Sequence, residues 1–188
     1  MEAFLISAGV VALAEIGDKT QLFALVLAAR FRRPLPIIAG ILAATLANHG
    51  AAGAIGTWLS SLLTPTVMRW ALILSFVSMA VWILVPDKYE EGGQPPAPRA
   101  GVFVSTLVGF FLLEIGDKTQ IATIALAAKY HALLPVVAGT TLGMMAVNIP
   151  AVLIGHSAAN RLPLKLVRAL AAVIFVVLSV LMLFGIGT

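Results

Sequence analysis

Six apolar stretches, each long enough to cross a bilayer, constrain the fold of this 188-residue chain more than any other feature. They lie at residues 3–29, 34–63, 67–85, 101–128, 132–159 and 162–186. A membrane-spanning helix needs about 20 apolar residues, and only helices or closed barrels satisfy the backbone polar groups in lipid. Hydrophobic residues make up 61% of the chain and charged residues 11%, unlike a soluble domain. The sequence therefore predicts an all-α integral membrane protein with six transmembrane helices.

Some of these stretches are longer than a bilayer requires, so a tilt, a break or an interfacial extension is expected in them. After the third stretch the chain becomes polar and rich in glycine and proline, which is typical of a flexible connector. We place a linker at residues 87–100, between a three-helix unit at 1–86 and another at 101–188.

The two units carry the same heptapeptide, Glu-Ile-Gly-Asp-Lys-Thr-Gln, at residues 15–21 and 114–120. The same offset of 99 residues aligns further pairs: Arg30 with Lys129, Pro36 with Pro135, Gly40 with Gly139, and Gly56 with Gly155. A unit with an odd number of spans reverses the side from which its copy enters the membrane. The sequence therefore predicts two inverted three-helix repeats.

Basic residues outside the motifs are divided unequally between the two expected sides of the membrane. The loops after the first, third and fifth stretches carry Arg30, Arg32, Arg33, Lys88, Arg99, Arg161, Lys165 and Arg168, whereas the other side carries Arg69 and Lys129. The positive-inside tendency therefore predicts a cytoplasmic linker and both termini outside. Because the basic residues sit in short loops, the net charge of +4 does not indicate nucleic-acid binding.

Each heptapeptide places two carboxylates inside an apolar stretch, where an unpaired charge is costly. On a continuous helix, Glu15 and Asp18 would lie on one face, and Glu114 and Asp117 would do the same. Inverted symmetry would bring the two pairs together near the bilayer midplane. The sequence therefore predicts a metal site made of these four acids.

The ligand type indicates which ion such a site would take. Carboxylate oxygens favour hard cations such as Mn²⁺, Ca²⁺ and Mg²⁺, whereas zinc and copper sites usually recruit histidine or cysteine, and this chain has no cysteine. The residues leave Mn²⁺ and Ca²⁺ open. Four acids and two lysines sum to −2, which one divalent cation or two protons would neutralise. We therefore expect cation/proton exchange.

Other motif residues have two interpretations each. Thr20, Gln21, Thr119 and Gln120 are candidate ligands, or they hold helices together. Lys19 and Lys118 are candidate counter-charges, or they pair within a helix with the glutamate four residues earlier. The glycine before each aspartate, Gly17 and Gly116, serves either close helix packing or a local break.

The second span of each unit adds two polar candidates. The offset makes His49 and Asn148 equivalent, and both are expected to line the pathway unless they only join helices. Met144 and Met145 are expected to be core residues, because adjacent helical positions do not share a face. No nucleotide-binding or hydrolase motif is present, so we expect no enzyme and no cofactor, and the energy must come from a gradient.

The doubled Glu-x-Gly-Asp-Lys-Thr motif in a six-span chain resembles the manganese-exporter family that includes bacterial MneA, and the related Golgi manganese and calcium transporters of eukaryotes. The match is at Glu15, Gly17, Asp18, Lys19 and Thr20, and again at Glu114, Gly116, Asp117, Lys118 and Thr119. The resemblance implies export of a divalent cation across the cell inner membrane, driven by proton entry, with the motif acids binding the ion.

Two alternatives from other classes stay open. The first is an exporter of organic solutes such as amino acids, because small six-span exporters of that kind share a similar repeat plan. The identity of the substrate distinguishes such an exporter from a cation transporter. A scaffold that transports nothing could also bury acids and lysines to fix helix packing, although buried ion pairs seldom improve stability. Whether the chain forms a homodimer is not readable from the residues.

Overall fold

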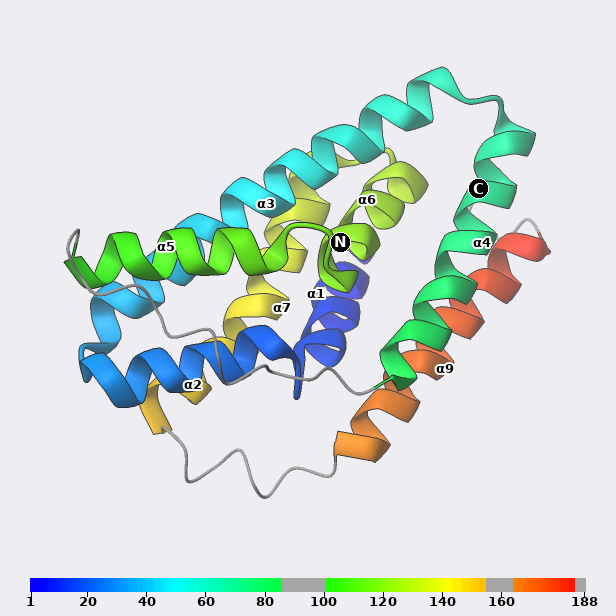
Figure 1. The fold of residues 1–188 in the computed structure, drawn as a ribbon. Coiled ribbons are helices and arrows are strands. Elements are labelled where there is room, and N and C mark those ends of the chain that lie inside the picture. The colour runs from blue at the N-terminus through cyan, green and yellow to red at the C-terminus, as the bar shows by residue number, and fades with distance from the viewer. Residues whose placement is uncertain (86–100, 155–163, 185–188) are drawn as a thin grey trace.

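The computed structural model describes residues 1–85, 101–154 and 164–184, and these residues are all-helical (Figure 1). The helices are α1 (Glu2–Glu15), α2 (Lys19–Phe31), α3 (Pro34–Leu62), α4 (Pro65–Leu84), α5 (Gly101–Glu114), α6 (Lys118–Tyr130), α7 (Leu133–Ile154) and α9 (Leu164–Leu183). The predicted linker at 87–100, together with Gly155 and Arg161, lies outside the described residues. The all-α fold class is confirmed.

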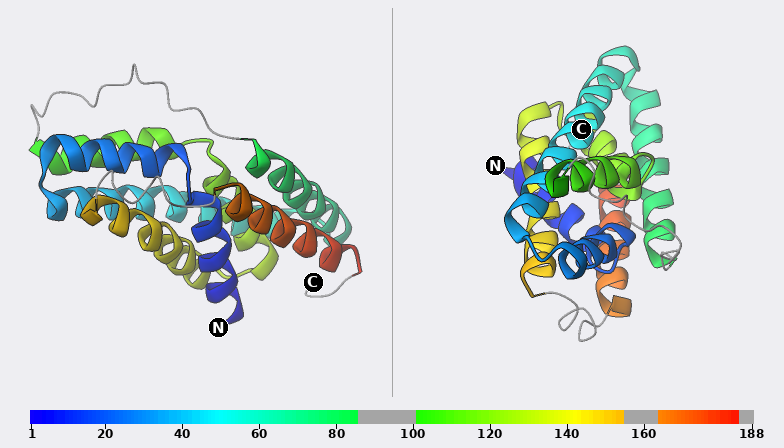
Figure 2. Two further views of the ribbon diagram at one scale, coloured as in Figure 1. Left: turned by 90° about the horizontal axis from the view of Figure 1, so that it is seen from below. Right: turned by 60° about the vertical axis from the view of Figure 1, so that its left-hand side comes forward.

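The first and fourth apolar stretches are each broken inside the heptapeptide, one of the alternatives that the sequence left open for the long stretches. The chain turns sharply between α1 and α2, as Figures 1 and 2 show, and a second break separates α5 from α6. The prediction that Glu15 and Asp18 share one face of one helix is therefore wrong, and so is the same prediction for Glu114 and Asp117. In each copy the glutamate ends one helix, and the aspartate occupies the N-cap position of the next.

The glycine between glutamate and aspartate makes each break. Gly17 has a φ of 77° and Gly116 a φ of 73°, values that residues with a side chain rarely adopt. A Cβ atom built on Gly116 meets no heavy atom within 4 Å, so this position requires backbone freedom and not space. Of the two expected roles of these glycines, the local break is confirmed.

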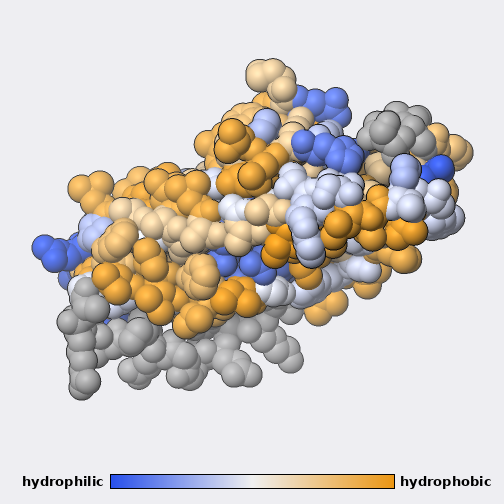
Figure 3. Space-filling model, turned by 90° about the horizontal axis from the view of Figure 1, so that it is seen from above, coloured by the Kyte–Doolittle hydropathy of each residue, from blue (hydrophilic) through white to orange (hydrophobic). Residues whose placement is uncertain are grey.

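Apolar side chains cover much of the molecular surface. Three helices among the described residues are long and apolar enough to cross a membrane, namely α3, α4 and residues 133–153 of α7. α5 and residues 168–183 of α9 are shorter apolar helices. Large apolar side chains such as Trp58, Leu74 and Val173 are exposed, and apolar residues dominate the face in Figure 3. Such a surface suits lipid, and the chain is a membrane protein.

Among the described residues, the helices of the two halves correspond one to one. The helices α1, α2, α3 and α4 begin 99 residues before α5, α6, α7 and α9, respectively. The halves are interleaved, because α7 packs on α1, α3 packs on α5, and α4 packs on α9. Phe76 and Phe175, also 99 residues apart, are both fully buried and contact each other with ring centroids 6.3 Å apart. A residue that touches its own repeat equivalent must lie close to any axis that relates the halves.

Two equivalent glycines let these helices approach each other closely. A Cβ atom on Gly139 in α7 would lie 2.3 Å from the carbonyl oxygen of Phe4 in α1. A Cβ atom on Gly40 in α3 would lie 2.9 Å from the carbonyl oxygen of Phe103 in α5. Both contacts pair the same two repeat positions, so α3 meets α5 in the same register as α7 meets α1.

We predict that Gly139→Ala lowers the thermal stability of the purified protein, because the new methyl group meets backbone that cannot move aside. The expected cost is about 1–3 kcal/mol, as for overpacked cores. The matched control is Gly9→Ala in α1, where a Cβ atom meets nothing within 4 Å. Melting curves in detergent measure both, and equal melting of the two variants would contradict the close approach.

Candidate ion site between the two halves

The two heptapeptides meet through crossed ion pairs. The Lys19 Nζ lies 2.9 Å from Asp117 Oδ1, and the Lys118 ammonium pairs in turn with Asp18. Each pair therefore joins a lysine of one half to an aspartate of the other. The expectation that each lysine pairs within its own helix with the preceding glutamate is wrong, because the break puts the two residues on different helices.

Each glutamate is held by the threonine of its own motif. The Thr119 hydroxyl donates to Glu114 Oε2 at 2.8 Å, and the Thr20 hydroxyl donates to Glu15. Both glutamates are fully buried. Among the described residues, Glu15 Oε2 and Glu114 Oε1 have no hydrogen-bond partner. Each motif thus presents one buried carboxylate oxygen that could still accept a proton or contact a cation.

The two motif glutamines accept hydrogen bonds from the backbone at the helix breaks. Gln21 Oε1 accepts from the Gly17 N–H at 2.8 Å, and Gln120 Oε1 accepts from the Gly116 N–H at 2.7 Å. This is the reach-back of a third helical residue to the backbone before the helix, as in a capping box. These side chains have a clear structural role, and a ligand role for them stays a prediction.

The polar residues of α3 and α7 reach the ends of the broken helices. Asn148 Nδ2 donates to Glu15 Oε1 at 2.9 Å, a contact between the halves. Asn48 Nδ2 donates to the carbonyl oxygen of Phe111 at 3.1 Å, near the end of α5. His49 is fully buried, like Asn148. Sequence reasoning gave no role to Asn48, because the repeat places a valine at the equivalent position.

The buried methionines of α7 behave as core residues. Met144 is 0% exposed and Met145 is 7% exposed, which confirms the packing interpretation. The Met144 carbonyl oxygen also accepts from Asn148 Nδ2 at 3.1 Å, and its sulfur lies 3.2 Å from the same atom. Met144 therefore helps to fix Asn148 beside Glu15.

The crossed pairs bring the aspartate of each motif to the lysine of the other without forming a ready metal site. In the part of the chain that the structure describes, no three histidine, aspartate or glutamate side chains are arranged to hold one metal ion. The positive charges beside Asp18 and Asp117 are lysine ammonium groups of the protein itself. Each motif aspartate is therefore paired with a lysine of the opposite half.

The two identical motifs have different surroundings. The Lys19 side chain is 28% exposed, whereas the Lys118 side chain is 3% exposed. Arg168 Nη2 donates to the Gly17 carbonyl oxygen at 3.3 Å, while the equivalent Arg69 reaches the carbonyl oxygen of Leu183. Both arginines lie within helices, so counting them as loop residues was wrong. Their shared offset of 99 residues was the sequence signal that could have indicated a paired role.

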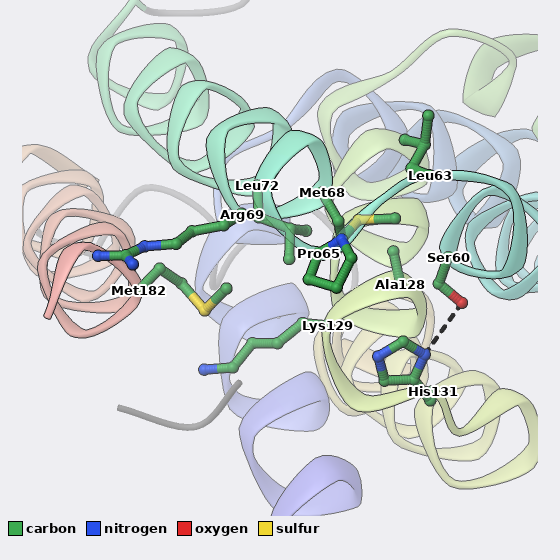
Figure 4. A pocket seen from close by; sticks show the side chains of 10 residues that line it. All are labelled: Ser60, Leu63, Pro65, Met68, Arg69, Leu72, Ala128, Lys129, His131 and Met182. Atoms are coloured by element: carbon green, nitrogen blue, oxygen red, sulfur yellow. Dashed lines mark hydrogen bonds between the residues drawn. The ribbon is translucent and has the colours of Figure 1, made fainter. Parts of the chain in front are cut away.

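A cavity of about 260 Å³ lies apart from the motifs, between the α3–α4 connection and the ends of α6 and α9 (Figure 4). Its polar lining consists of Arg69, Lys129, His131 and Ser60, and His131 Nδ1 lies 3.1 Å from Ser60 Oγ. Basic side chains without a carboxylate do not suit a cation. The residues of this cavity therefore do not suit a cation site.

Buried acids paired across two interleaved halves of an apolar helical protein are typical of membrane transporters for ions, in which such residues mark ion pathways. The chain belongs to the divalent cation/proton antiporter GDT1 family, whose model matches residues 3–91 and 102–187. The protein is thus a cation transporter, and its family is one of transporters, not of enzymes.

Curated relatives agree with this membership. The chain is 49% identical over 180 residues to a Vibrio cholerae protein named "Putative manganese exporter", covering 95% of this chain and 89% of the relative. It is 30% identical to the GDT1-like protein sll0615 of Synechocystis, covering 96% of each chain. It is 25% identical to the GDT1-like protein 3 of Oryza sativa, covering 95% of this chain and 72% of the relative. No solved structure matches this chain significantly.

We predict that Lys118→Met destabilises the protein more than Lys19→Met. Removing one partner of a buried ion pair typically costs about 3–5 kcal/mol, because the other charge is left unpaired. Lys19 is partly exposed, so in Lys19→Met water can reach the aspartate that is left behind, and the cost is smaller. Chemical or thermal unfolding in detergent measures both variants. Adding Asp18→Asn to Lys118→Met should recover part of the loss, because it removes the buried charge left behind. Equal losses for the two lysine variants, with no recovery, would contradict the crossed pairing.

Proposed function

We propose that this protein is a secondary transporter that exports a divalent cation, Mn²⁺ in the first place, in exchange for protons. The observation that carries the proposal is the crossed pairing of the two motifs, which brings Asp18 and Asp117 into one buried region beside Glu15 and Glu114. Family membership supports a cation as the substrate.

The binding site in this proposal consists of the four motif acids. A divalent cation enters beside the aspartates and takes over the charge balance that the lysines provide in the structure. Lys19 and Lys118 are then counter-charges that withdraw when the ion binds. The hydroxyl groups of Thr20 and Thr119 turn from the glutamates toward the ion, since hydroxyl oxygens are acceptable ligands for hard cations.

Proton exchange follows from the need to keep the interior neutral. Glu15 and Glu114 each have a buried carboxylate oxygen without a hydrogen-bond partner among the described residues, which is a place for a proton when the ion is absent. Two protons carry the same charge as one divalent cation. Binding of the cation then releases the protons, and an inward proton gradient drives the cation out.

The membrane arrangement in this proposal has six spans in two inverted repeats. The pairs α1–α2 and α5–α6 each form one broken span, which is how transporters with inverted repeats build a midplane site. The reciprocal glycine contacts and the Phe76–Phe175 contact support such symmetry. In the orientation that the basic residues favour, the protein lies in the cell inner membrane with its linker in the cytoplasm and both termini outside.

The substrate is proposed from the name of the Vibrio cholerae relative, which points to manganese. Ca²⁺ is the second candidate, because an oxygen-rich site accepts both ions. An exporter of amino acids or a scaffold is less well supported, since the family is one of divalent cation/proton antiporters. Formation of a homodimer by this protein remains a prediction.

We predict that Asp18→Asn and Asp117→Asn each strongly reduce Mn²⁺ transport while the protein still folds. Purified protein is placed in liposomes with a metal-sensitive dye inside, and a pH dye reports proton movement in the opposite direction. The transport rate should fall about tenfold or more. Even residues that only hydrogen-bond to metal ligands are typically worth about 10–100-fold in affinity or activity.

Glu2→Gln is the matched control for this experiment, because Glu2 is an exposed acid at the start of α1, hydrogen-bonded to Tyr130 at a distance of 3.4 Å. It should transport like the unmodified protein. Transport of an amino acid without any metal would favour the organic-solute exporter. No transport of either, with variants that merely melt earlier, would favour the scaffold. Metal movement without a pH change would contradict proton exchange.

A further inference from the structure

His49 is a buried imidazole that no contact in the structure explains. Its side chain is fully buried in α3, and neither ring nitrogen has a hydrogen-bond partner among the described residues. Thr45, four residues earlier on the same helix face, is also fully buried with an unpartnered hydroxyl. Buried polar groups in native proteins are nearly always satisfied, so these two need an explanation.

The repeat places His49 opposite Glu114. In the first of the two helix pairs, Gly139 of α7 lies against Phe4 of α1, and nine residues later Asn148 donates to Glu15. In the second pair, Gly40 of α3 lies against Phe103 of α5 in the same register. Nine residues after Gly40, α3 reaches His49, and eleven residues after Phe103, α5 reaches Glu114, the same steps that lead from Gly139 to Asn148 and from Phe4 to Glu15.

The hydrogen bond of Asn48 to Phe111 supports this placement, because it ties the preceding residue of α3 to the last turn of α5. Glu114 Oε1 is buried and has no hydrogen-bond partner in the described part of the chain. The two halves of the proposed site therefore also differ in the polar side chain that lies beside the glutamate. The first half offers an amide beside its glutamate, and the second half offers an imidazole.

We infer that His49 supplies a nitrogen ligand to the transported ion, next to Glu114, and thereby selects a transition metal such as Mn²⁺ over Ca²⁺. This inference rests on the proposed cation site and deepens it. Ca²⁺ takes oxygen ligands almost exclusively, whereas imidazole binds first-row transition metals. Four carboxylates alone would not separate the two ions, so the asymmetric histidine provides the discrimination that the motif lacks.

Pulsed electron paramagnetic resonance of Mn²⁺ bound to the full-length protein in detergent tests the ligand directly. The spectrum of the unmodified protein should show coupling to a ¹⁴N nucleus, and this coupling should be lost in His49→Asn and in His49→Gln. The matched control is His131→Asn, which changes a histidine that lines the separate cavity and should keep the coupling. Absence of nitrogen coupling in the unmodified protein, or its persistence in both His49 variants, would overturn the inference.

Competition between the two ions in liposomes gives a second readout. We predict that His49→Asn lowers the preference for Mn²⁺ over Ca²⁺ by about tenfold or more, the scale of contributions around metal sites. His131→Asn, in the separate cavity, should preserve the preference. If the unmodified protein moves Mn²⁺ and His49→Asn leaves the ion preference unchanged, this inference alone fails. If the unmodified protein neither binds nor moves Mn²⁺ or Ca²⁺, the proposed function fails as well.

Discussion

The pairing of each motif lysine with the aspartate of the opposite half is the interaction on which this structure depends. Asp18 and Asp117 are almost completely buried, and an isolated carboxylate in such surroundings would be very unfavourable. The pairs can form only because each apolar stretch is broken at a glycine with positive φ, which aims the aspartate across the interface. The interleaving of α1 with α7 and of α3 with α5 brings the breaks together. The same helix packing therefore forms both the fold and the candidate site.

Identical heptapeptides in unequal surroundings are what an alternating transporter requires. Lys19 is partly exposed and Lys118 is not, while Arg168 holds the backbone of the first break and its equivalent Arg69 does not hold the second. In an inverted repeat, exchanging the two environments would turn an opening toward one side into an opening toward the other. In the proposed mechanism the transported ion replaces the lysine–aspartate pairs. Pairs that form and break in this way would allow the two environments to exchange.

The sequence predicted the elements well and the contacts between them poorly. Apolar length located α3, α4 and α9 within a few residues, and the offset of 99 residues anticipated the matching of helices that the structure contains. The helix breaks were only one of two alternatives for Gly17 and Gly116. Glycine allows close helix packing as well as a backbone with positive φ, and the sequence does not tell these roles apart. The lysine partners were missed, since local spacing favours Glu15 with Lys19 and says nothing about Asp117, which is 98 positions away from that lysine. The register that places His49 also required the packing of α3 on α5.

Counting the Mn²⁺ ions bound per chain tests most directly whether both halves build one site. Free Mn²⁺ gives a strong electron paramagnetic resonance signal, so titration of the purified protein yields the stoichiometry. The account predicts one ion per chain, lost in Glu15→Gln/Asp18→Asn and equally lost in Glu114→Gln/Asp117→Asn. Two ions per chain, with each double variant removing only one of them, would contradict a shared site between the halves.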